Sequence, residues 1–505
     1  MAVAVLAATG AAQRLAPAGM VFPGFLINPV DGFSYLAKMR QGADGFWTFG
    51  LPYVGIQGGR GAIFLLYLAL GHLAAWLGAS SIGVYLAARF VTCLAMFLAC
   101  YALLTLLLPS RQERLWAYAL VLVGSGLGWV ALPFGLLATD LLVAESIPFV
   151  SALANPHFPL AYALVAGTVW LVLSGSKLRF RLPGAVLCGT VLGMVLPFAV
   201  LSLVAVLAVW LLLEFVLGRM GRSTLEPLAP AVTTACAGGV GAAPWILYDY
   251  WLTRTDPGLA AWNLQNQTPS PPIWAFAAGF GLVLLLALLG AYVGRLWSSR
   301  NGRLLLTWAA TNAVLLYLPF ALQRRLSLGL FVPMAAMAAI GLVWLSNRPP
   351  RWRWVPMALF ALAIPSNGMV VTAGLVSVAR GETSLVETTG EVSAFQWIAT
   401  HTPSEASILS APLTGTRLPA FADVRVVVGH PFETPDYQQR VSMVDRWFKG
   451  EVSPDQVLAG LASWNLKYVF YGPTEKALGP RPAWLDSLDA VYDRGGVQIY
   501  AVAPP

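Results

Sequence analysis

The sequence predicts a polytopic α-helical membrane protein with a small C-terminal α/β domain. Of its 505 residues, 58% are hydrophobic and 11% are charged. Soluble domains carry about 25% charged residues, so a soluble core could not hide this apolar surplus. The apolar residues form repeated runs of about 20, the length of helix that crosses the hydrocarbon core of a bilayer. After about residue 380 charged residues return at regular intervals, which indicates a water-exposed domain.

Clusters of basic residues indicate which side of the membrane each loop occupies. They lie at 111–114, 177–181, 219–222, 295–303 and 348–353, and neighbouring clusters are separated by enough apolar sequence for two crossings. All clusters therefore share one face, which the positive-inside rule makes cytoplasmic. The net charge of +8 has this origin. Because no basic face interleaved with aromatic residues is present, we expect no nucleic acid partner.

The apolar runs define the expected crossings. A first crossing within residues 1–25 would bring their number to about eleven. Gln13, Arg14 and Pro17 interrupt that first run, so we expect a chain that begins downstream of its natural start, with a short kinked helix as the alternative. The stretch 183–218 must hold two short helices with a turn near Pro197. The other expected spans are 82–108, 115–136, 152–174, 183–199, 200–218, 228–248, 272–294, 304–322, 328–346 and 354–376.

The topology divides the chain into a transmembrane part, 1–378, and an extracytoplasmic α/β domain, 379–505. In the first extracytoplasmic loop, 27–80, the apolar but short segment 61–78 is expected to form a helix along the outer leaflet. Residues in the C-terminal domain alternate in the manner of strands at 407–412, 424–430, 467–472 and 497–502. Helical patterns occur near 390–400, 436–448 and 454–464.

Polar side chains concentrate in the outer loops. Desolvating such groups at a membrane is costly, so they are candidates for function. A site on this face would act on lipid-linked or extracytoplasmic substrates. The candidates are Asp31, Tyr35, Lys38 and Arg40 in the first loop, Asp140, Glu145, Asn155 and His157 in the second, Asn266 in the third, and Gln323, Arg324 and Arg325 in the turn after residue 322.

The run NPVDGFSYLAKMRQGADGFW (28–47) places an acidic residue just after the first membrane segment, ahead of an outer-leaflet helix and many crossings. This layout resembles the GT-C superfamily of membrane glycosyltransferases, which includes protein O-mannosyltransferases and lipid A aminoarabinose transferases. The chain is most similar to bacterial members with segments like GSGLGW (124–129), NPHF (155–158), QRRLSLGLFVP (323–333) and GHPFET (429–434). GSGLGW is expected to lie inside a membrane helix and to serve helix packing.

The resemblance implies a multi-pass protein of the bacterial cytoplasmic membrane with its C-terminal domain outside. It also implies transfer of a sugar from a polyprenyl-phosphate donor to an extracytoplasmic glycan, lipid or protein acceptor. Asp31 matches the first-loop acid of these enzymes, and a carboxylate can take the proton of an acceptor hydroxyl. The alternative is a helix-capping or simple loop charge.

Further roles follow for the other outer-loop residues. Glu145 and His157 are expected to assist catalysis, and with Asp140 to hold a divalent ion such as Mg or Mn. The alternative is that they cap helices or meet lipid headgroups. Arg324 and Arg325 suit a carrier phosphate, or else anchor ordinary anionic lipid. The expected substrate-binding residues are Tyr35, Arg40, Asp140, Asn155, Asn266, Gln323, Arg324 and Arg325.

Two other functions stay open. A transporter or flippase for lipid-linked saccharides would show repeated halves and charged residues buried in mid-helix. The sequence shows no internal repeat, and its polar groups gather at one face, which favours an enzyme. A catalytically inactive paralogue with an interaction role is the third interpretation, because the first apolar run is interrupted.

Overall fold

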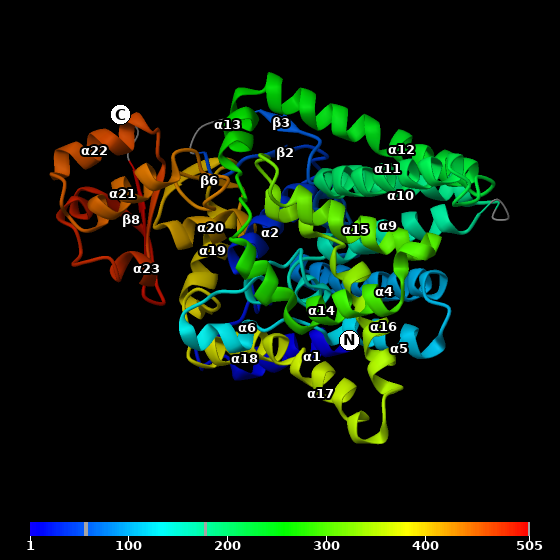
Figure 1. Ribbon diagram of the computed structural model, residues 1–505. Coiled ribbons are helices and arrows are strands. Elements are labelled where there is room, and N and C mark those ends of the chain that lie inside the picture. The colour runs from blue at the N-terminus through cyan, green and yellow to red at the C-terminus, as the bar shows by residue number, and fades with distance from the viewer. Residues whose placement is uncertain (55–58, 176–178, 503–505) are drawn as a thin grey trace. The chain divides into compact units, whose positions relative to one another are not determined.

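The chain folds into two compact units. The computed structural model describes residues 1–54, 59–175 and 179–502, and Figure 1 labels its helices and strands. The bundle unit contains Met1–Ala8, Ala87–Asp249 and Gln267–Ala373. The sheet unit contains Thr9–Leu86, Tyr250–Asn266 and Gly374–Pro505. The C-terminal segment is therefore part of a larger compact unit that also includes residues 27–80.

The apolar runs form helices. Five are long and apolar enough to cross a membrane, namely α4 (Ser81–Leu107), α11 (Pro197–Arg219), α12 (Leu228–Thr255), α14 (Ile273–Val293) and the stretch Pro350–Ala379. α5 (Arg111–Val123) and the stretch Gly128–Phe134 make a sixth if they count as one span bent by 45°. In the described residues, helix length and composition thus support five or six crossings, fewer than the sequence predicted.

The other predicted spans fall on shorter helices. α9 (His157–Leu173) has 17 residues, α10 (Arg181–Val195) has 15, and α15 (Arg300–Leu315) and α16 (Phe331–Ser346) have 16 each. Leu196, with φ −152° and ψ 73°, separates α10 from α11, which confirms the turn predicted near Pro197. The N-terminal run forms α1 (Ala2–Leu15).

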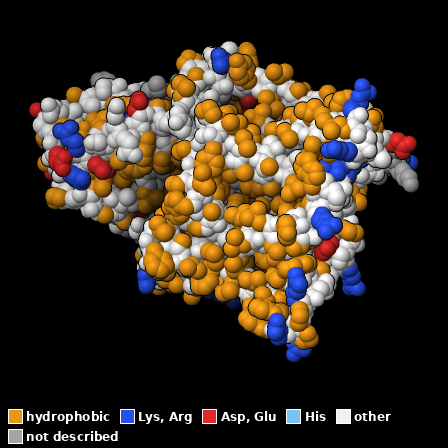
Figure 2. All heavy atoms as spheres, in the orientation of Figure 1, with side chains coloured by type: hydrophobic (Ala, Val, Ile, Leu, Met, Phe, Trp, Pro, Cys, Tyr) orange, Lys and Arg blue, Asp and Glu red, His pale blue; other side chains and the backbone are white. Residues whose placement is uncertain are grey.

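Helix α16 is the core of the bundle unit. Every residue from Phe331 to Ala339 is buried, and the helix packs against α14, α5 and α15. The outer helices instead expose large apolar side chains, such as Leu212 (64%) and Leu285 (60%). Figure 2 shows hydrophobic side chains over most of the visible helical surface, with Lys and Arg side chains near helix ends. Such a continuous apolar surface suits contact with lipid.

A five-stranded sheet organises the C-terminal part of the sheet unit, in the order β6-β5-β7-β9-β8 (Figure 1). β5 (Ala406–Leu409) is parallel to β6 (Val424–Val426) and β7 (Tyr468–Tyr471), whereas β9 (Val497–Ala501) and β8 (Asp489–Arg494) complete it antiparallel. Successive strand residues face opposite sides. Ile408 therefore packs with α19 (Thr389–His401) and α20 (Pro412–Phe421), and Leu409 with α21 (Tyr437–Phe448) and α22 (Pro454–Ser463).

The predicted elements of this region are confirmed in part. The predicted strands correspond to β5, β6, β7 and β9, and the predicted helices to α19, α21 and α22. β8 was missed because its residues, DAVYDR, are largely polar and exposed and lack apolar alternation. α20 was missed because Gly415 and Pro419 interrupt it in the manner of a loop.

Two helices of the first loop pack closely in the sheet unit. α2 (Pro29–Ala43) and α3 (Leu65–Leu77) approach until a Cβ on Gly71 would stand 1.9 Å from the carbonyl oxygen of Met39. Only glycine fits there. α3 buries one face and exposes Trp76 (81%) and Leu77 (55%) on the other. The helix expected within 61–78 is thus present, and its position along the outer leaflet stays a prediction.

The remaining elements are short. Two small antiparallel pairs join β1 (Met20–Val21) to β4 (Glu387–Thr388), and β2 (Phe49–Gly50) to β3 (Arg60–Gly61). The other helices are α6 (Gly128–Ala131), η1 (Leu132–Phe134), α7 (Thr139–Leu142), α8 (Pro148–Leu153), α13 (Pro257–Gln265), η2 (Leu296–Ser298), η3 (Gln323–Ser327), η4 (Pro350–Trp352), α17 (Val355–Leu362), α18 (Pro365–Ala379), α23 (Pro473–Lys476) and η5 (Ala483–Ser487).

Candidate active site

Helix α2 of the sheet unit carries Asp31, Ser34 and Lys38 along one side, because positions three, four and seven apart share a helix face. Pro29 occupies the first helical turn, where its fixed φ suits a helix start. Asp31 lies in the same turn, where the helix dipole favours a negative charge. Its side chain is 40% exposed, so a substrate can reach the carboxylate.

His430, in the loop after β6, contacts Asp31. Its Nε2 lies 3.0 Å from Oδ1 of Asp31, and the backbone N–H of Phe432 donates to its Nδ1 at 3.2 Å. A ring nitrogen that accepts a hydrogen bond carries no proton, so the neutral ring has its proton on Nε2 and donates it to Asp31. The histidine side chain is only 6% exposed.

A buried ion pair lies further along the same helix face. The ammonium of Lys38 is 2.8 Å from Oε1 of Glu433, and Ser34 donates to the same oxygen at 2.5 Å. Lys38 is 0% exposed and the Glu433 side chain 7%. Burial alone would raise the pKa of Glu433, but Lys38 and His430 hold that pKa below its usual range. Burial lowers the pKa of Lys38, against the attraction of Glu433.

The loop 429–434 is held by its own hydrogen bonds and by α13. The backbone N–H of Gly429 donates to the Thr434 hydroxyl at 3.0 Å, and the Glu433 N–H to the carbonyl of His430 at 3.0 Å. The side-chain amide of Gln265 donates to the carbonyls of Pro431 and Thr434, at 2.8 and 2.5 Å. The loop begins at the carboxyl end of a parallel strand, the edge where such sheets commonly bind ligands.

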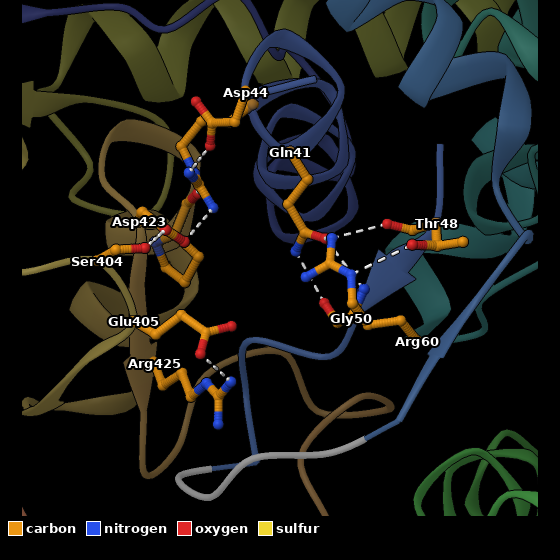
Figure 3. Close-up of polar contacts among 11 residues, drawn as sticks. Gln41, Asp44, Thr48, Gly50, Arg60, Ser404, Glu405, Asp423 and Arg425 are labelled. Carbon is orange, nitrogen blue, oxygen red and sulfur yellow. Dashed lines mark hydrogen bonds and ion pairs between the residues drawn. The ribbon is translucent and has the colours of Figure 1, made fainter. Parts of the chain in front are cut away.

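Arg40 and Tyr35, both predicted to bind substrate, have protein partners in the sheet unit. Arg40 pairs with Asp44 and with Asp423 (3.0 Å), and donates to the carbonyl of Pro419 at 2.9 Å. Figure 3 shows this cluster, in which Ser404 also bonds Asp423. The ring of Tyr35 stacks on Tyr67 with centroids 4.1 Å apart.

Gln41, which follows Arg40 in the sequence, holds the β2–β3 pair (Figure 3). Its side-chain amide exchanges two hydrogen bonds with the backbone of Gly50, at 2.8 and 3.0 Å. Arg60 donates to the same amide oxygen at 3.0 Å and to the carbonyl of Thr48 at 2.7 Å. These contacts stabilise the end of α2. The substrate-binding role of Arg40 stays a prediction. The contacts of Arg40 with Asp44, Asp423 and Pro419 hold the protein's own structure together.

Asp140 organises a glycine turn in the bundle unit. Its Oδ2 accepts the N–H groups of Gly126 (3.0 Å) and Gly128 (3.1 Å), and its side chain is fully buried. Burial raises the pKa of this carboxyl, and the hydrogen bonds oppose that rise. Residues 124–127 of GSGLGW are therefore the break between α5 and α6, and the expectation that the whole segment lies inside one helix is wrong. Asp140 matches the capping alternative.

The other second-loop residues are buried in the bundle unit, and their neighbour Ser146 contacts η3 (Gln323–Ser327), the arginine turn. Glu145, Asn155 and His157 are 4%, 1% and 5% exposed. Ser146 donates to the hydroxyl of Ser327 at 2.7 Å, and Ser327 ends η3, which also carries Gln323, Arg324 and Arg325.

Polar contacts fix η3 in the bundle unit. The side-chain oxygen of Gln323 accepts the N–H of Ser270 at 3.1 Å, and the N–H of Arg324 donates to the carbonyl of Thr268 at 3.1 Å. The guanidinium of Arg325 lies 5.5 Å from the centre of the Phe198 ring. Asn266, predicted to bind substrate, ends α13 in the sheet unit.

No protein-family model matches the sequence, and no curated protein sequence matches it. Solved structures do match its fold. The Archaeoglobus fulgidus oligosaccharyltransferase, solved with a tethered acceptor peptide, aligns over 100% of this chain and 74% of its own, with TM-score 0.58 and 13% identity. ArnT from Cupriavidus metallidurans, bound to undecaprenyl phosphate, aligns over 99% and 97%, with TM-score 0.53 and 14% identity.

A mycobacterial arabinofuranosyltransferase, AftD, aligns over 100% of this chain and 40% of its own, with TM-score 0.57 and 15% identity. All three structures are GT-C glycosyltransferases. The chain has the GT-C fold. Similarity at this level of identity establishes the fold that the sequence resemblance implied, and the reaction is a separate question.

A structure of the archaeal enzyme with Zn and sulfate, with TM-score 0.54 and 13% identity, raises the question of a metal site here. Among the residues that the structure describes, no three His, Cys, Asp or Glu side chains converge as a metal site requires. Asp140, Glu145 and His157 therefore do not fit the ligand set predicted from the sequence, and Asp140 already accepts two backbone N–H groups.

Sequence reasoning missed His430 and Glu433 as site residues. Lys38 was noted only as one polar residue of the first loop. One signal was available, because Lys38 stands between Ala37 and Met39 in a largely apolar helix, and a lysine buried there needs an anion. The GHPFET segment, noted for its resemblance, contains both partners.

Proposed function

We propose that this protein is a membrane glycosyltransferase that moves a sugar from a polyprenyl phosphate to an extracytoplasmic glycan, lipid or protein acceptor. The observation that carries the proposal is Asp31, a partly exposed carboxylate held by His430 in a chain with the GT-C fold. ArnT was solved with undecaprenyl phosphate and an archaeal oligosaccharyltransferase with a dolichol-phosphate. Those ligands support a lipid-linked donor here.

In the proposed reaction Asp31 is the general base. It takes the proton of the acceptor hydroxyl as that oxygen bonds to the anomeric carbon of the donor sugar. The bond from this carbon to the phosphate oxygen breaks, and the polyprenyl phosphate leaves with the electron pair. A positioned base contributes about 10²–10⁴-fold to such a rate.

The arginine turn is the proposed site of the carrier phosphate. Arg324 and Arg325 are partly exposed on η3, and a guanidinium presents paired donors that match phosphate oxygens. Gln323, Asn155 and Asn266 would contact the donor or acceptor. Glu145 and His157, both buried in the bundle unit, would help to position the donor. No step of the proposed reaction passes through a metal ion.

The proposed location is the bacterial cytoplasmic membrane, with the C-terminal segment outside. A helix of 16 residues, such as α16, is about 24 Å long at 1.5 Å per residue. That is shorter than the roughly 30 Å hydrocarbon core. Because α16 is buried by other helices rather than by lipid, it can cross without matching the full thickness. We propose that α1, α9, α10 and α15 cross with it, which would give about eleven crossings.

The transporter alternative predicts buried charges in the middle of membrane helices. The clearest buried pair of the bundle unit joins Glu214 and Arg303, with contacts of 2.5 and 2.9 Å. Glu214 lies near the end of α11 and Arg303 near the start of α15, and Ser223 bonds both. This position at the helix ends is that of a structural anchor, so it favours the enzyme.

The test is a deletion strain complemented with wild type, Asp31→Asn or the exposed control Asp455→Asn at equal membrane abundance. Wild type and the control should restore a missing envelope sugar. The Asp31→Asn strain should lack the sugar and accumulate its polyprenyl-phosphate donor, measured by mass spectrometry of extracted lipids. If Asp31→Asn fully restored the envelope sugar, the catalytic role of Asp31 would be rejected and the transporter function would be favoured.

A further inference from the structure

Both nitrogens of the His430 ring have hydrogen-bond partners within the sheet unit. Nδ1 accepts from the backbone of Phe432, and Nε2 contacts Asp31. Because the Phe432 N–H can only donate, the ring has one donor left, and that donor is directed at the candidate base. The histidine side chain is nearly buried at 6% exposure, whereas Asp31 is 40% exposed.

The backbone that carries His430 is anchored at a second point on the same helix. Glu433 lies three residues after His430 and bonds Ser34 and Lys38, which lie three and seven residues after Asp31. The contact of His430 with Asp31 and the contacts of Glu433 with Ser34 and Lys38 therefore attach the loop to one face of α2 at two successive points. Together with the bonds from Gln265, they prevent the His430 ring from moving away from Asp31.

We propose that His430 is a positioning residue for glycosyl transfer: it donates a hydrogen bond to Asp31 and sets the direction of the carboxylate toward the acceptor hydroxyl. This inference rests on the proposed function. An aspartate in the first turn of a helix can otherwise turn toward the N–H groups of its own helix. A misplacement of about 1 Å in a reacting group can reduce the rate by about 10²-fold.

The same geometry determines the path of the proton. Nδ1 of His430 is occupied by the Phe432 N–H, so the ring cannot accept a proton there without breaking that bond. The acceptor's proton therefore stays on Asp31 after sugar transfer and leaves from its exposed side to water. His430 therefore acts on Asp31 through a hydrogen bond, which distinguishes it from a histidine that relays protons.

The experiment compares His430→Gln with His430→Phe. The terminal amide of glutamine can reach the place of Nε2 and donate to Asp31, whereas phenylalanine fills the space without a donor. His401→Phe is the matched control, because His401 is exposed on α19 of the same unit. In the described residues, its ring nitrogen bonds only its near neighbours Thr400 and Trp397. The probe is the lipid-linked sugar that accumulates in the deletion strain, supplied to membranes of each variant.

We expect His430→Phe to lose about 100-fold in kcat with KM changed little, and His430→Gln to stay within about 10-fold of wild type. His401→Phe should match wild type. Melting temperatures in detergent show whether each variant is folded, and if His430→Phe is not, the glutamine variant decides. A folded His430→Gln as impaired as Asp31→Asn, or a fully active His430→Phe, would overturn the inference.

The two proposals fail in different ways. If wild type itself consumes no lipid-linked sugar, the proposed function is wrong. If wild type is active and Asp31→Asn is inactive while His430→Phe keeps full activity, only the positioning role is wrong.

Discussion

Lys38→Met removes the cation from the buried ion pair behind Asp31. The ammonium is 0% exposed and lies 2.8 Å from a carboxylate that is 7% exposed. Methionine keeps the apolar stem, so the substitution removes charge rather than volume. A carboxylate left unpaired at this depth costs about 3–5 kcal/mol. At about 2–4 °C per kcal/mol for a domain of this size, Tm should fall by about 6–20 °C.

The loss should also depend on pH. In the wild type, Lys38 and His430 hold the pKa of Glu433 low, so this carboxylate stabilises the fold above its unfolded pKa and loses that effect as the pH falls. Without Lys38, burial dominates and raises the pKa of Glu433. Protonation then relieves the unpaired charge at low pH, so the difference in Tm between variant and wild type should grow as the pH rises from about 5 to about 8.

Thermal unfolding of the detergent-purified protein measures both effects, with Arg446→Met as the control. Arg446 and Glu451 are 60% and 53% exposed and 3.8 Å apart, and such surface pairs contribute about 0–1 kcal/mol. The double variant Lys38→Met/Glu433→Gln removes both charges and should recover most of the loss. A Lys38→Met as mild as Arg446→Met, or a double variant no better than the single, would refute the reasoning.

Three further substitutions test other parts of the fold by thermal unfolding. Burial raises the pKa of Glu387 from 4.5 to about 7, although Arg417 opposes this. The contribution of Glu387 to the stability of the fold is therefore complete below pH 4.5 and is lost as the pH rises toward 7. Glu387→Gln should flatten that part of the curve of Tm against pH. An unchanged curve would contradict this prediction. Asp140→Asn should be mild, because an amide oxygen can accept the same two N–H groups, whereas Asp140→Ala leaves both unpaired at about 1–3 kcal/mol each; equal losses would argue against the capping role. Gly71→Ala should cost about 1–3 kcal/mol because α2 and α3 must separate, while Gly10→Ala, with open space around it, should not; equal Tm values would exclude such close packing.

Asp31 could be predicted from sequence because its signal is local. It follows an apolar run, lies on the outer side of the predicted topology, and matches the first-loop acid of the resembled family. His430 could not be predicted in the same way, since it meets Asp31 across 399 positions of the chain. The burial of Lys38 implies an anion, but several acids on the same side could have supplied it. Only the fold identifies Glu433.

The crossings show a similar limit. Hydropathy averages over a window, so the run 115–136 reads as one span. The backbone instead breaks after Val123, where Asp140 binds the N–H groups of Gly126 and Gly128. The carboxylate of Asp140, which lies outside the run 115–136, therefore helps to determine where α5 ends. An average of hydropathy over that run cannot include this effect.

The C-terminal segment supplies contacts that orient the candidate base. Its loop 429–434 supplies the donor to Asp31 and the anion to Lys38, whose ammonium would otherwise be buried beside the rings of Phe49 and Phe64 without a carboxylate partner. An accessory domain that only captured an acceptor could be removed while α2 kept its structure. Here removal would take the carboxylate partner from Lys38 and the hydrogen-bond donor from Asp31, so this segment is part of the candidate active site.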